Sequence, residues 1–225
     1  MTKTISRRDF LKVGCLTGAA AGLATCGVAG LAASGPEPAP VDLSSSTYGE
    51  NPVKPRILVT YASLTGSTAE IAAEIGKTIS AQGFCVDVRP ALENPSVDRY
   101  QAVVVGSAIK FGSWLPEAVD FIKNNQEALG RIPVALFCVH IRCTDDSEAS
   151  RQERQSYMNE VSPLLHAVSE GHFAGRFNRQ GAALLVPGIL AGFVPTLDFR
   201  DWDKIRLWAE QIQPQLVRSG ESAIN

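Results

Sequence analysis

The amino-acid sequence predicts an α/β fold in which a doubly wound sheet of five parallel strands, in the order 2-1-3-4-5, carries helices on both faces. Two observations lead to this prediction. Short runs rich in Val, Ile and Leu alternate along the chain with longer segments whose apolar residues recur at helical spacing. The first run ends in a loop of Ser, Thr and Gly that leads directly into a helix. Sheets of this kind bind ligands at the carboxyl ends of their strands, so we expect the functional site there.

The predicted strands are short and almost wholly apolar, as in a parallel sheet that is buried on both faces. They span residues 56–62, 84–89, 102–107, 133–140 and 181–186. Three of them are followed by more polar or glycine-containing segments, at 63–68, 107–114 and 140–146. Because parallel strands all end at the same edge of a sheet, these three segments are expected to meet.

Four helices are predicted between and after these strands. The first two, at 69–81 and from Pro116 onward, each present one apolar stripe to the sheet. The third covers residues 148–169. Its expected buried side chains are Tyr157, Val161, Leu164, Leu165 and Val168. The last helix begins with Asp201 as its N-cap, and Pro214 is expected to kink or end it.

The N-terminal segment has the pattern of a twin-arginine export signal. Arg7 and Arg8 precede an uncharged run, rich in Ala and Gly, from Val13 to Ala33. A transmembrane anchor is the alternative, because the run reaches the length that spans a bilayer, but its Ala/Gly composition favours a signal. We therefore exclude residues 1–33 from the fold.

The segment around Cys26 resembles a bacterial lipobox, in which this cysteine becomes the lipidated first residue. Ordinary cleavage near Ala32 or Ala33 is the alternative. The Pro- and Ser-rich residues 34–55 are predicted to form a linker, 56–219 the folded domain and 220–225 a tail.

Composition supports one globular domain after the signal. The full chain has 21 basic and 23 acidic residues, and removing residues 1–33 leaves 17 and 22, a net charge of −5, which argues against a nucleic-acid partner. Roughly 170 residues can bury a full core without disulfides. Cys85, Cys138 and Cys143 remain, without the paired spacing of a metal site. Cys138 and Cys143 either form a disulfide or leave Cys138 buried in a strand.

The loop Ser63-Leu64-Thr65-Gly66-Ser67-Thr68 is suited to an anion. It lies at a helix start, where the backbone N–H groups from Leu64 to Ala69 and the positive end of the helix dipole favour negative charge. Four hydroxyl groups, those of Ser63, Thr65, Ser67 and Thr68, add further donors, so no cationic side chain is needed. Ordinary capping of the helix by Ser and Thr is the alternative.

This loop resembles the FMN phosphate loop of flavodoxins. The resemblance extends to residues 103–114 and 201–205, which are similar to the flavodoxin-like branch that includes the menaquinone-dependent protoporphyrinogen oxidases, and it covers roughly residues 56–212. It implies that FMN is the cofactor, that electrons pass through the bound flavin, and that no side-chain nucleophile is required.

The resemblance also implies which residues surround the flavin ring. They are Ala108, Ile109, Lys110, Phe111 and Gly112, with Gly112 allowing a close backbone approach. Lys110 is either a ring-edge contact or a solvated charge. Trp114 either flanks the flavin or packs in the core beside Leu115.

Two polar residues follow the fourth predicted strand. His140 either contacts the flavin or a substrate, or caps the strand end. Arg142 either stabilises the anionic reduced flavin or pairs with Asp145 or Asp146. His166 and His172 fall in the third helix and the loop after it, without metal-ligand spacing, and no metal is expected.

The function expected from these features is that of an exported, FMN-binding oxidoreductase that exchanges electrons with a quinone or another small molecule. The alternative is an electron carrier of the cell envelope that docks on a redox protein and has no substrate of its own. The apolar segment 187–195 either lines a substrate pocket or covers the core. Contact with the membrane is expected only through the signal or a lipid anchor.

Replacing both arginines of the signal, Arg7→Lys with Arg8→Lys, is expected to leave the protein in the cytoplasm, because the export route reads the arginine pair. Cell fractionation followed by immunoblotting measures this. Normal export of the double variant would show that the segment is not a twin-arginine signal.

Overall fold

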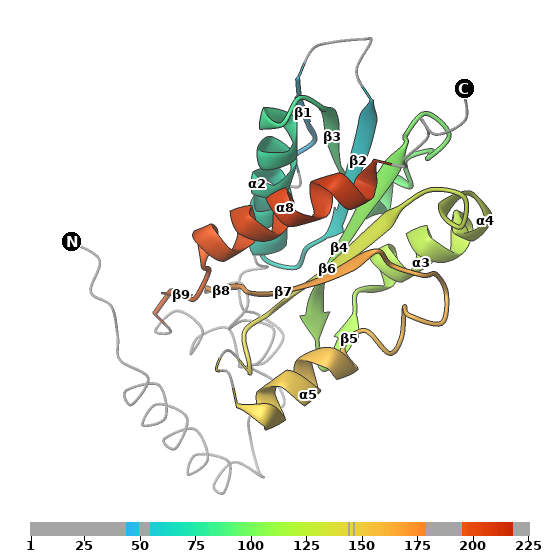
Figure 1. Ribbon diagram of the computed structural model, residues 1–225. Coiled ribbons are helices and arrows are strands. Elements are labelled where there is room, and N and C mark those ends of the chain that lie inside the picture. Colours follow the sequence, from blue (N-terminus) through green and yellow to red (C-terminus); the bar gives the residue numbers. More distant parts are fainter. Residues whose placement is uncertain (1–43, 50–54, 144, 146, 179–194, 218–225) are drawn as a thin grey trace, which may run out of the picture.

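The computed structural model describes residues 44–49, 55–143, 145, 147–178 and 195–217. The main sheet has the strand order β1-β3-β2-β4-β6-β7 (Figure 1). Its five parallel strands are β2 (Arg56–Ala62), β3 (Cys85–Pro90), β4 (Ala102–Lys110), β6 (Val134–His140) and β7 (Ser169–Ala174). Numbered along the chain, these five lie in the order 2-1-3-4-5, so the predicted topology is confirmed.

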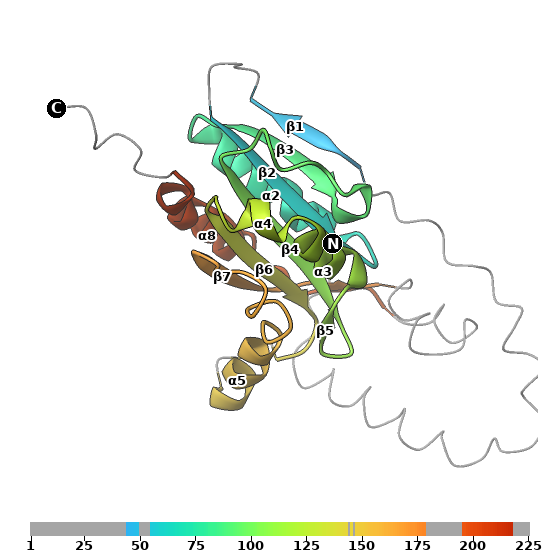
Figure 2. The same ribbon diagram turned by 90° about the vertical axis from the view of Figure 1, so that its right-hand side faces the viewer.

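Helices cover both faces of this sheet (Figures 1 and 2). On one face lie α2 (Ser67–Ala81) and α8 (Trp202–Leu216), and on the other lie α3 (Pro116–Asn124) and α4 (Gln126–Leu129). Each layer encloses its own apolar cluster. One contains the Ile side chains of α2 and α8, and the other contains apolar side chains of α3 and of residues 157–165. A short 3-10 helix, Ala91–Glu93, and α5 (Glu148–Ser156) complete the helical elements of the described ranges.

The fifth parallel strand lies earlier in the chain than predicted. The segment 181–186 is outside the described residues, and β7 occupies residues that we assigned to the end of a helix and the following loop. His172 therefore lies on a strand. The sequence of β7 lacks an apolar run because β7 is the last strand of the described sheet and most of its residues are only partly buried. At Gly171, Trp208 of α8 fills the space, and an added Cβ would come within 2.9 Å of the indole.

The predicted helix at 148–169 is also shorter in the structure. It ends at Ser156, and successive turns follow as far as residue 164. Tyr157, Val161 and Leu165 are nevertheless buried, as expected from their spacing, whereas Val168 is exposed.

The last helix begins as predicted and continues for two residues beyond Pro214. Asp201 caps α8 by accepting a hydrogen bond from the Lys204 N–H at 2.9 Å. Pro214 lies inside α8, which ends at Leu216, two residues later.

An additional strand lies within the segment predicted as linker. β1 (Ser46–Tyr48) pairs antiparallel with β3 at the sheet edge. The buried carboxylate of Asp87 joins the two strands, because it accepts hydrogen bonds from Thr47 at 2.7 Å, Arg56 at 2.7 Å and Tyr100 at 2.8 Å. Burial alone would raise the pKa of Asp87, but these donors lower it below its usual value.

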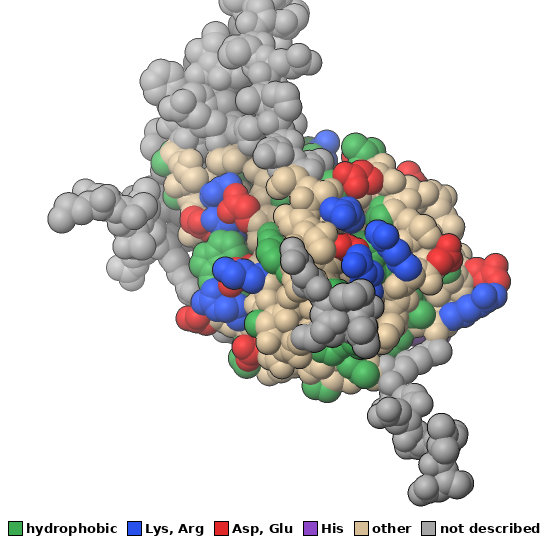
Figure 3. Space-filling model, turned by 90° about the horizontal axis from the view of Figure 1, so that it is seen from above, with side chains coloured by type: hydrophobic (Ala, Val, Ile, Leu, Met, Phe, Trp, Pro, Cys, Tyr) green, Lys and Arg blue, Asp and Glu red, His purple; other side chains and the backbone are tan. Residues whose placement is uncertain are grey.

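The charges on the upper face of the molecule are mixed in sign. Viewed from above the orientation of Figure 1, Lys and Arg side chains lie beside Asp and Glu side chains (Figure 3). Charges on this face therefore neutralise one another locally rather than forming a field of one sign.

Candidate functional site

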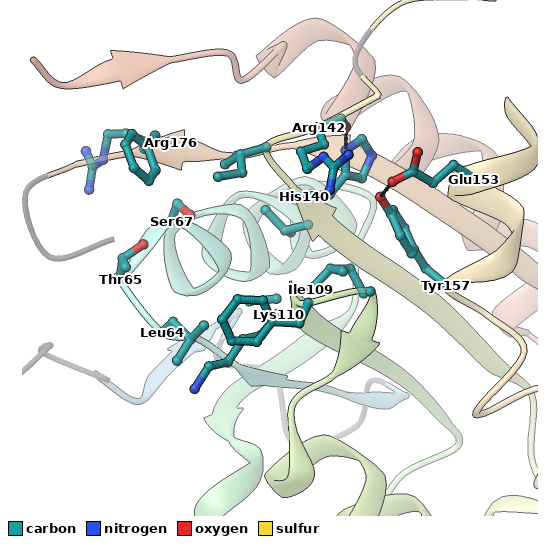
Figure 4. Close-up of a pocket in the computed structure, with 17 residues that line it drawn as sticks. Leu64, Thr65, Ser67, Ile109, Lys110, His140, Arg142, Glu153, Tyr157 and Arg176 are labelled. Carbon is teal, nitrogen blue, oxygen red and sulfur yellow. Dashed lines mark hydrogen bonds between the residues drawn. The ribbon is translucent and has the colours of Figure 1, made fainter. Parts of the chain in front are cut away.

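A cavity of about 630 Å³ opens at the carboxyl edge of the sheet (Figure 4). It is bounded by the segments that follow β2, β4 and β6, as predicted, and also by α5 and by the chain after β7. Its lining consists of Leu64, Thr65, Ser67, Ala108 to Gly112, Val139 to Arg142, Glu153, Tyr157 and Gly175 to Phe177. Ten of the fourteen predicted site residues are in this set; Ser63, Gly66, Thr68 and Trp114 are not.

The loop after β2 forms one side of the cavity and presents hydrogen-bond donors to it. Gly66, with φ at 86°, turns the chain into α2, and its N–H donates to the Ser63 hydroxyl oxygen at 3.1 Å. Within the described ranges, no side chain caps this helix, so the N–H groups of residues 67–69 lack helical or capping partners, and the first helical bond runs from the Glu70 N–H to the Gly66 carbonyl at 3.1 Å. The buried Thr68 hydroxyl likewise has no partner among the described residues. Unpaired donors at a positive helix end match an anion such as phosphate.

The segment 108–112 forms one side of the cavity as a tight hairpin. β4 pairs with the two-residue strand β5 (Ser113–Trp114), and Phe111 and Gly112 make the turn with φ values of 52° and 89°. Such a turn suits glycine or asparagine, yet Phe111 adopts it with 81 % of its surface exposed. A strained, exposed aromatic residue at a cavity rim indicates a binding role.

Trp114 packs in the core and does not line the cavity. It is 3 % exposed and lies in the cluster formed by β4, α3 and residues 157–165. Its backbone N–H donates to the Glu160 carboxylate at 3.2 Å, which fixes the end of the hairpin. Of the two interpretations of Trp114, the structure therefore shows core packing.

The charged side chains that line the cavity are mainly cationic. They are Lys110, Arg142, Arg176 and one acid, Glu153. Arg142 is exposed, and Asp145, one of its two expected partners, instead accepts a hydrogen bond from the Ser147 N–H at 2.9 Å; the other, Asp146, lies outside the described residues. This excess of positive charge favours an anionic ligand.

Residues 58–184 match the family model described as Flavodoxin domain. The chain belongs to the flavodoxin domain family. This match confirms the resemblance that its phosphate loop indicates.

FMN is the cofactor of this flavodoxin domain, and the lining of the cavity fits it. The unpaired N–H and hydroxyl donors around Thr65, Ser67 and Thr68 suit its phosphate. The rest of the lining includes apolar side chains, among them Ile109, Phe111 and Val139, which suit an aromatic ring system.

Curated relatives and solved structures were compared with the chain. Protoporphyrinogen IX dehydrogenase [quinone] of Escherichia coli K12 is 26 % identical over 88 residues, which are 38 % of this chain and 49 % of that protein. The chain thus spans about half the length of the curated relatives it matches. Oxidised flavodoxin 2 from Bacillus cereus is 20 % identical, with a TM-score of 0.48 over 71 % of this chain and 99 % of that one. A flavoprotein from Lactobacillus acidophilus in complex with FMN is 14 % identical, with a TM-score of 0.40 over 53 % and 93 %.

Sequence reasoning missed the second wall of the cavity. Glu153 and Tyr157 belong to a segment predicted as one long helix, and Gly175, Arg176 and Phe177 follow a strand that was predicted elsewhere. Tyr157 donates a hydrogen bond to Glu153 at 3.0 Å, and this pair stands beside His140 in Figure 4. Burial, followed by the adjacent Glu153 carboxylate, raises the pKa of Tyr157, so its hydroxyl stays protonated.

The cysteines do not form the disulfide that the sequence left open. Cys138 and Cys143 are both free, and Cys138 is buried in β6 with its Sγ 3.2 Å from Nδ1 of His172. Burial raises the pKa of Cys138 to about 12, so it remains a thiol. Within the described ranges, no group of three or more His, Cys, Asp or Glu side chains is placed to hold a metal ion.

His140 is a neutral side chain with one defined tautomer. Its Nδ1 lies 2.5 Å from the carbonyl oxygen of Arg142, which can only accept, so Nδ1 carries the proton. Nε2 is then an acceptor, and it is buried without a partner among the described residues. Burial lowers the pKa of His140 to about 4, with the nearby His172, Arg154 and Lys204 adding to the effect.

This depressed pKa predicts a loss of stability in acid. The unfolded chain takes up a proton at His140 near pH 6.5, whereas the folded protein does so only near pH 4, so protonation favours unfolding between these values. We expect His140 to contribute a decrease of about 3 kcal/mol in the free energy of unfolding across this interval. Urea unfolding of the FMN-free protein at several pH values measures it.

Two variants isolate this contribution. For His140→Phe, the free energy of unfolding should decrease less between pH 6.5 and pH 4 than for the wild type. The control His166→Gln, at an exposed histidine, should show the same decrease as the wild type. An identical decrease for His140→Phe and the wild type would contradict a depressed pKa at His140.

Proposed function

We propose that the protein is an exported FMN-dependent oxidoreductase that exchanges electrons with a small, largely apolar molecule of the quinone class. FMN, when bound, supplies the reversible acceptance of two electrons. The chain's own residues bind and orient the cofactor, exclude water from one side of it and provide a neighbouring site for the second molecule.

The observation that carries the proposal is the shape and lining of the cavity. It extends from the phosphate loop, past the hairpin at 108–112, to Glu153 of α5 and Tyr157 at the end of that helix (Figure 4). Ile109, Phe111, Ile141 and Phe177 supply an apolar surface, and Lys110 and Arg142 supply donors. A quinone presents the matching features, an apolar ring with two carbonyl acceptors.

Two further observations support the finer parts of the proposal. The name of the Escherichia coli relative describes a dehydrogenase that uses a quinone. The arginine pair and uncharged run in residues 1–33, which are outside the described residues, support export, and the sequence at Cys26 supports a lipid anchor. Within the part of the chain that the structure describes, no helix combines the length and apolar character needed to cross a membrane.

One observation favours the alternative, a carrier that docks on a redox protein. Phe111 and Ile141 lie on the rim of the cavity with 81 % and 38 % of their surfaces exposed. An exposed apolar rim beside a flavin also suits a protein partner. The two functions differ in whether a small molecule binds before electrons move.

Saturation kinetics separate them. The FMN-loaded protein is reduced without oxygen and mixed with increasing concentrations of menadione, and the reoxidation rate is followed by flavin absorbance. A binding site predicts a rate that saturates. A rate that stays linear in menadione concentration would contradict the small-molecule site and favour the carrier.

Matched variants at two exposed apolar residues test whether the site is this cavity. We expect Ile141→Ser at the rim to raise the half-saturating concentration roughly fivefold, from the loss of about 1 kcal/mol of apolar contact. Leu207→Ser, on α8 and outside the cavity lining, should leave it unchanged. Equal effects of both variants would place the small molecule elsewhere.

A further inference from the structure

The chain that follows β7 lies directly against the phosphate loop. An added Cβ at Gly175 would stand 3.3 Å from the Ser67 hydroxyl and 2.8 Å from Val139, so this close approach needs glycine. Asn178 donates a hydrogen bond to the Thr65 carbonyl at 3.4 Å. Between them, β8 (Arg176–Phe177) pairs with β9 (Leu197–Asp198) to form a short ribbon. The phosphate loop is therefore packed against the segment that follows β7, the last strand in the order of the sheet.

Two arginines of this region converge on one acid of the phosphate-binding helix. Glu70, in the first turn of α2, accepts a hydrogen bond from Arg176 at 2.5 Å and another from Arg200. Arg200 is held firmly in place. Its side chain is 5 % exposed, bonds to Asp198 at 2.6 Å and stacks over the Trp202 ring at 4.5 Å.

Arg176 differs from Arg200 in position and in its bonds. It lines the cavity, and Figure 4 shows it on the same side as Thr65 and Ser67. Its side chain is 27 % exposed, and Glu70 is its one hydrogen-bond partner among the described residues. A guanidinium has five N–H donors in a planar fork, so this contact leaves most of them available.

The charges explain why a cation is needed at this helix. A phosphate group bears about −1.5 to −2 charges at neutral pH, and Glu70 lies in the same helical turn that receives it. Arg200 is shared between Asp198 and Glu70, so Arg176 is the second cation on Glu70 and the one that lines the cavity. Without Arg176, Arg200 alone in this cluster would face Glu70, Asp198 and the phosphate.

We propose that Arg176 binds the phosphate of FMN and that Glu70 acts as a positioning residue which holds the guanidinium beside the phosphate loop. This inference rests on FMN binding in the cavity. It replaces the expectation that the loop needs no cationic side chain. It also makes Arg176, together with the donors of the phosphate loop, a residue that distinguishes FMN from riboflavin, the same ring system without a phosphate.

Titration of flavin fluorescence with FMN and with riboflavin tests the proposal. For Arg176→Gln we expect FMN affinity to fall at least tenfold, as for the loss of a hydrogen bond between charged groups, and riboflavin affinity to stay within about twofold. Arg176→Lys keeps the charge but loses the fork, and should show an intermediate loss for FMN alone. Inorganic phosphate should compete with FMN more weakly in Arg176→Gln than in the wild type.

The matched control is Arg206→Gln. Arg206 makes an equivalent ion pair with Glu74, one turn further along α2 at 2.9 Å, but does not line the cavity. The Arg206→Gln variant should leave the affinities for FMN and for riboflavin unchanged. Riboflavin binding also reports whether each variant is folded.

Three results would overturn the proposal. Unchanged FMN affinity in Arg176→Gln would show that the side chain does not reach the phosphate. An equal loss for FMN and riboflavin would show a structural role for the ribbon. A wild-type protein that binds neither flavin would refute FMN binding itself, and this result is distinct from the other two.

Discussion

The parallel pairing of β4 between β2 and β6 is the constraint on which the site depends. In this register Ala62 lies opposite Ser107, and Ala108 lies opposite Val139, so the loops that follow the three strands meet at one edge. The pairing requires glycine at position 106. An added Cβ there would come within 2.0 Å of the Phe137 ring, which itself packs against Phe173 and Trp208. The core that fixes the register thus also places the phosphate loop, the hairpin and His140 around one cavity.

Where the structural signal is local, the sequence predicted the fold well, and ten of the fourteen predicted site residues line the cavity. Four of the five parallel strands are apolar runs, α2 carries its isoleucines on one face, and Asp201 caps α8 as expected. The phosphate loop is also a local feature, because the donors come from consecutive residues between a strand and a helix. These features gave the family and the cofactor without long-range information.

What the sequence did not reveal depends on contacts between distant residues. β7 is not apolar in sequence because it is the last strand of the described sheet and is only partly buried, and because Trp208, far along the chain, fills the space above Gly171. Because the fifth strand was predicted at 181–186, the ribbon that follows β7 was not expected, and Arg176 was not predicted as a site residue. Arg176 and its neighbour Arg200 both bond to Glu70, which lies 106 and 130 residues before them in the chain. Trp114 was ambiguous because its spacing fits both a ring contact and the core, and only its burial distinguishes them.

The central claim is that one FMN binds in the cavity with its phosphate on the loop from Ser63 to Thr68. Equilibrium dialysis of the wild type and of the double variant Thr65→Ala with Ser67→Ala tests it most directly. We expect one FMN per chain in the wild type and an affinity roughly tenfold or more lower in the variant, from about 1 kcal/mol for each lost hydrogen bond. An unchanged affinity in the double variant, or a wild type that takes up no FMN, would contradict this account.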